Sequence, residues 1–62
     1  MKIIIEIATD NAAFTDHKYG KLGEISRILR RITQRIENGE LSGKCMDFNG
    51  NSVGTWDVQE EE

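Results

Sequence analysis

The chain has 62 residues and a net charge of −3 at pH 7, which allows one small domain spanning residues 1–62. A chain of this length buries only about 60% of its unfolded surface, so small domains often add a disulfide, a metal ion or a partner subunit. Because the sequence holds one cysteine and one histidine, it cannot close an internal disulfide, and we expect no metal or other cofactor. Self-association is the remaining way to add stability, and we therefore expect a homodimer.

The apolar stretches are all too short to span a bilayer or to form the apolar region of a secretory signal. An unpaired cysteine fits the reducing environment of the cytoplasm. We therefore expect a cytoplasmic protein that makes no membrane contact.

The first predicted strand covers residues 2–8, whose sequence KIIIEIA is rich in β-branched side chains. A period of two assigns these side chains to two faces of the strand: Ile3, Ile5 and Ile7 on one, and Ile4 and Glu6 on the other. Residues 9–19 have no clear period and are predicted to form a loop. Within that loop, residues 12–14 (AAF) are expected to pack against the edge of the core.

A long amphipathic helix is predicted over residues 20–38, followed by Gly39 as a left-handed cap. Its apolar stripe recurs at spacings of three, four, three and four and consists of Leu22, Ile25, Leu29, Ile32 and Ile36. The opposite face carries four arginines: Arg27, Arg30, Arg31 and Arg35. The stripe must lie on a second element, which leaves the arginines on the outside.

The C-terminal part is predicted to be a β-hairpin, because Asn49-Gly50 between two β-prone runs is a strong turn signal. Its strands cover residues 44–47 and 52–58, and residues 59–62 are expected to be an acidic, frayed tail.

The sequence allows two registers for this hairpin. A three-residue loop with a glycine bulge sets Cys45 opposite Val53 and turns Met46 and Trp56 to the other face, whereas a two-residue turn redistributes these side chains.

These elements predict an α+β fold, a small β-α-β-β domain with one amphipathic helix packed on a three-stranded sheet. The helix can cover only one face, where we expect Ile3, Ile5 and Ile7. The other face, with Ile4 and, in the bulged register, Met46 and Trp56, is the expected dimer interface. Either edge strand could also pair with another copy of the chain.

Catalysis is not expected from these residues. His17 and Cys45 are the only pair that could serve as base and nucleophile, and we expect Cys45 to be a small buried hydrophobe. Asp47 and Asp57 could be nominated as paired carboxylates, but solvated surface charges are the plainer interpretation.

The arginine face is the leading candidate for partner binding, because the planar arginine fork binds carboxylates and phosphates bidentately. A solvated outer face is the plainer alternative. Nucleic acid is disfavoured by the net negative charge and by an aromatic content of 6%. Two locations are expected for Trp56: the core, or an interface with a partner, where tryptophan is enriched. The candidate partner-binding residues are Arg27, Arg30, Arg31, Arg35 and Trp56, and the expected partner is a host protein with an acidic surface.

Two stretches, residues 11–14 (NAAF) with the helix segment GEISRILR, and the ending DFNGNSVGTW, resemble short hypothetical proteins of bacteriophages and prophages. This resemblance implies a small phage-encoded accessory protein that binds and modulates or inhibits a host protein, such as a component of a defence system. Two alternatives remain: a dimer that binds nucleic acid or a nucleotide through the arginine face, and a purely structural dimeric accessory subunit.

Overall fold

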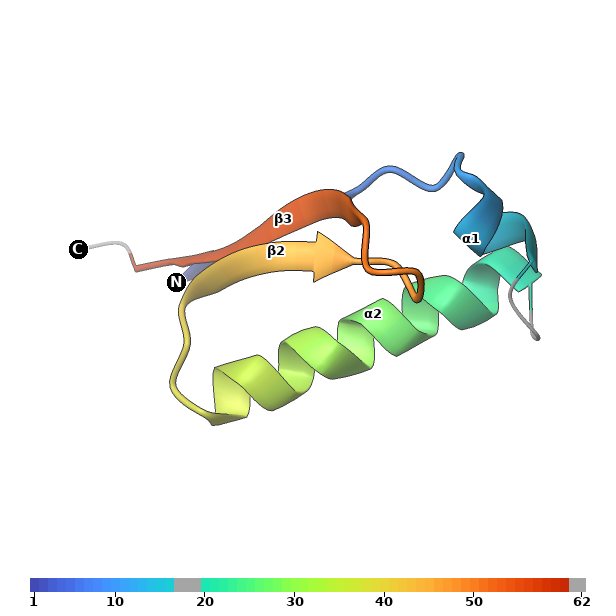
Figure 1. Ribbon diagram of the computed structural model, residues 1–62. Coiled ribbons are helices and arrows are strands. Elements are labelled where there is room, and N and C mark those ends of the chain that lie inside the picture. Colours follow the sequence, from blue (N-terminus) through green and yellow to red (C-terminus); the bar gives the residue numbers. More distant parts are fainter. Residues whose placement is uncertain (17–19, 61–62) are drawn as a thin grey trace.

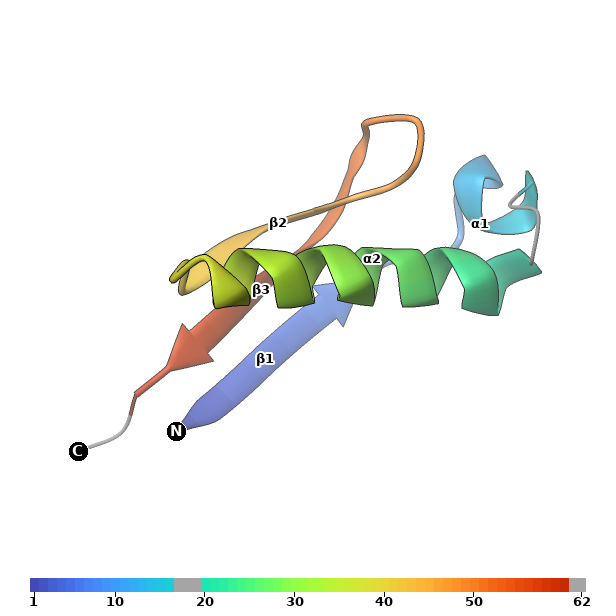
Figure 2. The same cartoon turned by 90° about the horizontal axis from the view of Figure 1, so that it is seen from below.

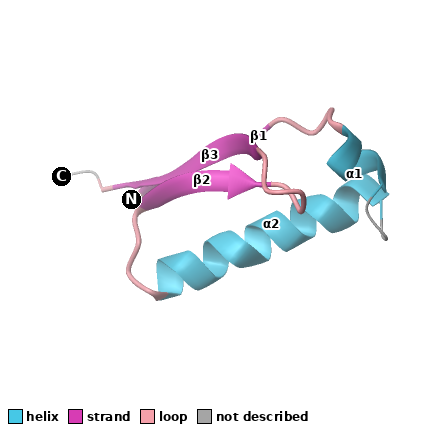
Figure 3. Ribbon diagram, viewed as in Figure 1, coloured by secondary structure: helices cyan, strands magenta, loops and turns pink. Residues whose placement is uncertain are grey.

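The computed structural model describes residues 1–16 and 20–60, which form two helices and one three-stranded sheet (Figure 1). The elements in chain order are β1 (Lys2–Ile7), α1 (Ala12–Asp16), α2 (Gly20–Glu37), β2 (Ser42–Met46) and β3 (Ser52–Gln59). The predicted α+β fold is therefore confirmed, with α2 lying along one face of the sheet (Figure 3). Helix α1 is an addition, because the segment that contains it was predicted to be a loop.

Helix α1 is short, and a capping hydrogen bond fixes its start. The side chain of Asn11 accepts a hydrogen bond from the backbone N–H of Ala13 at 3.0 Å, which is the geometry of a helix N-cap. Ala13 and Phe14 are completely buried against α2, which confirms the predicted packing at the core edge for these two residues, whereas Ala12 is exposed.

The sheet is antiparallel throughout, with the strand order β1-β3-β2, so that β3 is central and β1 and β2 are edges. The backbone N–H of Ala8 donates to Val53 at 2.8 Å on one side of β3, and that of Val58 donates to Leu41 at 2.8 Å on the other. Gly54 permits the close pairing of β1 with β3, because a Cβ there would collide with the backbone carbonyl of Glu6.

The hairpin combines the two registers that the sequence left open: its pairing at the turn is that of the three-residue loop, and its pairing further along β3 is that of the two-residue turn. Met46 pairs with Ser52, as a three-residue loop requires, but a bulge then shifts the register, so that Cys45 pairs with Gly54 instead of Val53. Trp56 consequently lies on the same face as Cys45, beneath α2, and is 1% exposed. The outer position of Trp56, expected only if the register of the three-residue loop continued along β3, was wrong, because one extra residue in a strand reverses every side chain beyond it.

Helix α2 begins at Gly20 and ends at Glu37, close to the predicted bounds, but it presents a different face to the core. Its buried residues are Glu24, Ile28 and Ile32, spaced by four. Part of the predicted stripe is exposed and consists of Leu22, Leu29 and Ile36. At about 100° per residue, the helix is rotated by roughly 80° from the predicted orientation.

The hydrophobic core is small and draws on every element except β1. It consists of Ala13, Phe14, Ile28, Ile32, Cys45, Val53 and Trp56. Strand β1 diverges from α2 toward its N-terminal end (Figure 2). Ile3 and Ile5 therefore remain 53% and 38% exposed, and the expectation that the helix would bury them was wrong. Only Ile7 of this strand packs against the core.

The predicted dimer interface is not one surface in this structure. Ile4 is on β1 and Met46 is on β2, at opposite edges of the sheet, and Trp56 lies beneath the helix. The face of the sheet away from α2 is mostly polar, because the residues that share it with Ile4 are Lys2, Glu6, Lys44, Thr55 and Asp57. This face therefore lacks the apolar patch that the sequence suggested.

Replacing Gly54 by alanine tests the close approach of β1 to β3. We expect Gly54→Ala to lower the free energy of unfolding by about 1–3 kcal/mol, because the new methyl group forces the strands apart. Urea unfolding followed by Trp56 fluorescence measures this loss. Ser52→Ala, at an exposed position of the same strand, should change stability by no more than about 0.5 kcal/mol. Equal effects of the two substitutions would contradict the close approach.

Candidate functional site

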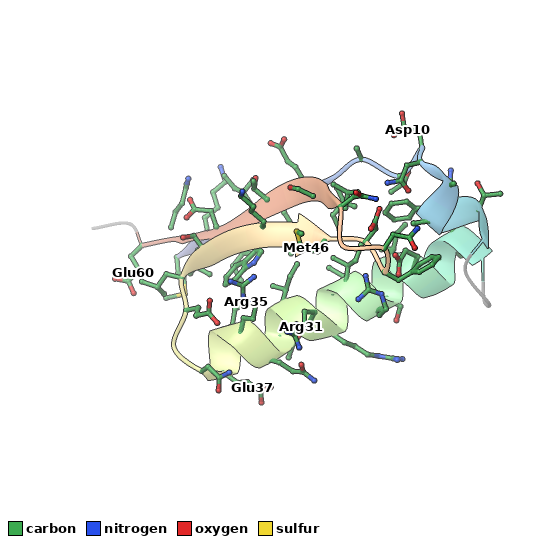
Figure 4. All side chains as sticks on the ribbon, viewed as in Figure 1. Asp10, Arg31, Arg35, Glu37, Met46 and Glu60 are labelled. Carbon is green, nitrogen blue, oxygen red and sulfur yellow. The ribbon has the colours of Figure 1, made fainter. Side chains whose placement is uncertain are left out.

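A groove runs between α2 and the free edge of β2, with a cavity volume of about 180 Å³. Its lining consists of Arg27, Ile28, Arg31, Ile32, Arg35, Lys44, Cys45 and Met46. Figure 4 shows Arg35 between the helix and the sheet, with Arg31 on the helix and Met46 on the strand opposite. Pockets for drug-sized ligands usually measure about 300–1,000 Å³, so this groove suits a single side chain.

Three arginines form one row along this groove, because residues four apart lie on the same face of a helix. The two outer ones are bonded to the edge of β2: Arg27 Nη2 donates to the carbonyl of Met46 at 2.8 Å, and Arg35 Nη1 donates to that of Lys44 at 3.4 Å. Arginine side chains thus donate hydrogen bonds to backbone carbonyl groups of β2 that point away from β3.

Glu24 holds the first arginine of the row in place. Its side chain is completely buried, and Oε1 accepts a hydrogen bond from Arg27 Nε at 2.6 Å. Oε2 accepts a second one from the backbone N–H of Phe48 at 2.8 Å, which ties the loop after β2 to the helix. Glu24 is not among the candidate residues of the sequence analysis. Its four-residue spacing from Ile28 was the available signal that it belongs to the buried side.

Arg35, the last arginine of the row, is fixed by an acidic partner and an aromatic one. Its Nη2 and Nε atoms lie 2.9 and 3.1 Å from Glu40 Oε1, and this hydrogen bonding raises the pKa of Arg35 above its usual value. The guanidinium also lies over the ring of Trp56, 5.8 Å from the centroid. Gly43 makes room for both side chains, since a Cβ there would lie 2.8 Å from Trp56 Nε1.

Trp56 was predicted to contact a partner. Because its side chain is buried, it belongs to the core instead. The indole lies beneath Arg35, and its Nε1 has no hydrogen-bond partner among residues 1–16 and 20–60. Trp56 therefore supports an arginine of the groove and presents no surface of its own.

The middle arginine of the row differs from its neighbours. Arg31 is exposed and has no hydrogen bond or ion pair within the described part of the chain. Arg30 is also exposed but does not line the groove. The structure thus brings together three of the four predicted arginines along the groove, where the backbone carbonyl of Lys44 accepts a hydrogen bond from Arg35.

Cys45 lies in the apolar floor of the groove, as a buried thiol. Burial raises its pKa, and the charge of Arg35 opposes this shift. His17, proposed as its base, lies outside the described residues. In the part of the chain that the structure describes, no group of three or more His, Cys, Asp or Glu side chains could hold a metal ion. Within the same residues, no helix is long and apolar enough to cross a membrane.

Asp47 is buried at the start of the hairpin turn and is not the solvated charge that was expected. Its carboxylate accepts hydrogen bonds from the backbone N–H groups of Asn51 and Asn49, both at 2.9 Å, and from Asn11 Nδ2 at 2.8 Å. These donors, above all the N–H of Asn51, lower the pKa of Asp47 from its ordinary value of 3.8. Asp47 therefore organises the turn and joins it to the segment before α1.

Comparisons with protein-family models, with curated proteins and with solved structures found no match. The function has therefore to be inferred from the groove and its chemistry.

The hydrogen bonds to Asp47 predict a specific loss of stability in acid. The unfolded carboxyl binds its proton near 3.8 and the folded one only at lower pH, so this stabilisation is present above the ordinary pKa. It is lost as the pH falls through the folded pKa. We expect Asp47→Asn to be less stable at neutral pH and to lose less stability on acidification. Urea unfolding at stepped pH measures both slopes, and parallel slopes would contradict this role of Asp47.

The burial of Cys45 predicts a slow reaction with iodoacetamide. The thiol is shielded and its pKa is raised, so we expect alkylation of the native protein at neutral pH to be at least about tenfold slower than that of the urea-unfolded chain. Mass spectrometry of timed samples gives both rates. A native rate equal to or above the unfolded one would identify an activated thiol.

Proposed function

We propose that this chain is a small non-enzymatic binding protein, whose groove receives an acidic side chain from a partner protein and thereby modulates that partner. The observation that carries the proposal is the position of Arg31, without a carboxylate partner in the described structure, between two arginines that are already held in place.

The charge of the groove favours an anionic guest. The three arginines of the row (Arg27, Arg31 and Arg35) are balanced by only two carboxylates, Glu24 and Glu40. Because these carboxylates bond the outer arginines, Arg31 keeps its donors for an incoming carboxylate, which it can bind bidentately. The order already imposed on its neighbours lowers the entropy that binding would cost.

The floor of the groove favours a protein over a nucleic acid. Ile28, Ile32 and Cys45 form an apolar base, which suits the methylene groups of a glutamate or an adjoining apolar side chain. A charged phosphodiester backbone would gain little from contact with this apolar surface. The net charge of −3 also opposes the approach of a long polyanion.

The biological setting in this proposal comes from the resemblance to short bacteriophage proteins. A phage-encoded protein of this kind would work in the cytoplasm of the host and would bind a host protein with an acidic surface. Inhibition of a host defence component is one such role. Its effect would come from occupying a surface of that partner, without chemistry of its own.

Charge reversal at Arg31 tests the groove, and Arg30→Glu is the matched control on the same helix. The probes are a fluorescein-labelled peptide rich in glutamate and leucine, and labelled random-sequence DNA and RNA, in fluorescence-anisotropy titrations at low salt. We expect the wild type to bind the peptide and Arg31→Glu to bind it at least about tenfold more weakly, because a charged hydrogen bond contributes about 1.5–3 kcal/mol. Arg30→Glu should bind nearly as well as the wild type.

The alternatives give different results in the same experiment. Binding of DNA or RNA but not of the peptide would support the nucleic-acid alternative, because phosphate contacts are strongest at low salt. An equal loss in both variants would show a diffuse charge effect and would contradict a binding role for the groove.

A further inference from the structure

The two edges of the sheet differ in how their backbone groups are occupied. The bond from Ala8 N–H to Val53 sets the alternation along β1, so the N–H and C=O groups of Ile3 and Ile5 point away from β3. Among the described residues, no side chain bonds to them. On β2, by contrast, arginines of α2 occupy the outward carbonyls. An edge strand whose outward backbone groups are unpaired is a template for another strand.

The sequence of β1 is complementary to itself when two copies run antiparallel. Residues 2–6 read KIIIE, with a cation at one end and an anion at the other. If two such strands are centred on Ile4, Lys2 of each copy lies opposite Glu6 of the partner subunit. Ile3 then lies opposite Ile5 of the partner subunit, and these are the residues whose backbone groups point outward. Directly opposite charges stabilise a strand pair, so charge and hydrogen bonding select the same register.

The exposed apolar side chains also fit this arrangement. Ile3 and Ile5 lie on the face of the sheet that carries α2 and are not covered by it. Antiparallel pairing about a two-fold axis perpendicular to the sheet keeps the side chains of both copies on their original faces. The isoleucines of the two β1 strands would form one apolar ladder between the two helices. The exposed row of α2, which includes Leu29 and Ile36, lies on the helix shoulder away from the arginines and faces the same space.

We propose that two copies of this chain pair through β1, in antiparallel register centred on Ile4, to form one six-stranded sheet with both α2 helices on the same face. A register moved by two residues, centred on Ile5, would set Ile4 opposite Glu6 and would lose both charge pairs. The groove lies at the opposite edge, on β2, and stays open in each copy. The proposal is therefore independent of what the groove binds.

Charge reversal in β1 tests this register. Light scattering across a dilution series gives the mass of the wild type, which we expect to be that of a dimer. In Lys2→Glu the interface gains two facing pairs of carboxylates, and in Glu6→Lys two facing pairs of ammonium groups. Each single variant should dissociate at a concentration at least about tenfold higher than the wild type. Lys21→Glu, an exposed change of equal charge on α2, should leave the dimer intact.

Mixing the two single variants gives the sharpest result. In a heterodimer of Lys2→Glu with Glu6→Lys, every charge again lies opposite its counter-charge, so the mixture and the double variant should both recover the dimer mass. Far-UV circular dichroism of each variant confirms that the fold is retained. A monomeric wild type at all concentrations, or a dimer that Lys2→Glu leaves unchanged, would overturn the proposal. Neither result would bear on the groove, which is tested separately through Arg31.

Discussion

The polar attachment of α2 to the edge of β2 decides how the helix lies on the sheet. Glu24 is completely buried, and a carboxylate in that position is costly unless it is paired and hydrogen-bonded. Arg27 and the backbone N–H of Phe48 satisfy it, and Arg27 reaches onward to the carbonyl of Met46. These bonds require Glu24 to face the sheet, and the helix is rotated accordingly.

The rotation has opposite consequences for the two edges of the sheet. On the β2 side it brings a row of arginines against the strand, where two of them occupy backbone carbonyls and the third lies between them. On the β1 side it leaves Leu29 and Ile36 of the helix and Ile3 and Ile5 of the strand exposed. One edge thus becomes cationic and protected from strand pairing, and the other stays apolar and open. The same helix orientation underlies both the groove and the pairing edge.

Much of the fold follows from the sequence because its signals are local. The three-residue and four-residue spacings predicted α2, and Asn49-Gly50 predicted the hairpin, although not its register. The register beyond the turn was not predictable, because the bulge at Val53 reflects packing of the whole sheet. Periodicity also indicates which face of a helix is apolar, but not which neighbouring element packs against that face. Leu22 belongs to the stripe and is exposed, whereas Glu24 lies outside it and is buried.

The site was only partly predictable for the same reason. The arginine row is visible in the helical spacing, but its division into bonded and unbonded members depends in part on residues outside the helix. The carbonyl groups of Met46 and Lys44 belong to β2, and Glu40 bonds to Arg35 from the loop that follows α2. Asp47 offered a local signal, since an aspartate before N-G-N is typical of a turn that its own carboxylate organises. Its further bond to Asn11 joins segments 36 residues apart, which no local pattern records.

The groove and the open edge are physically complementary in a chain of this size. A groove that admits one side chain makes few contacts with a partner. A small core also gives the monomer little stability to offset the cost of an exposed binding surface. Pairing through β1 would bury the isoleucines that the monomer exposes and would add their burial to its stability. It would also place one groove at each end of a continuous sheet. A partner with two acidic sites in reach of both grooves would then bind the second at a high effective concentration, so that two weak contacts act as one strong one.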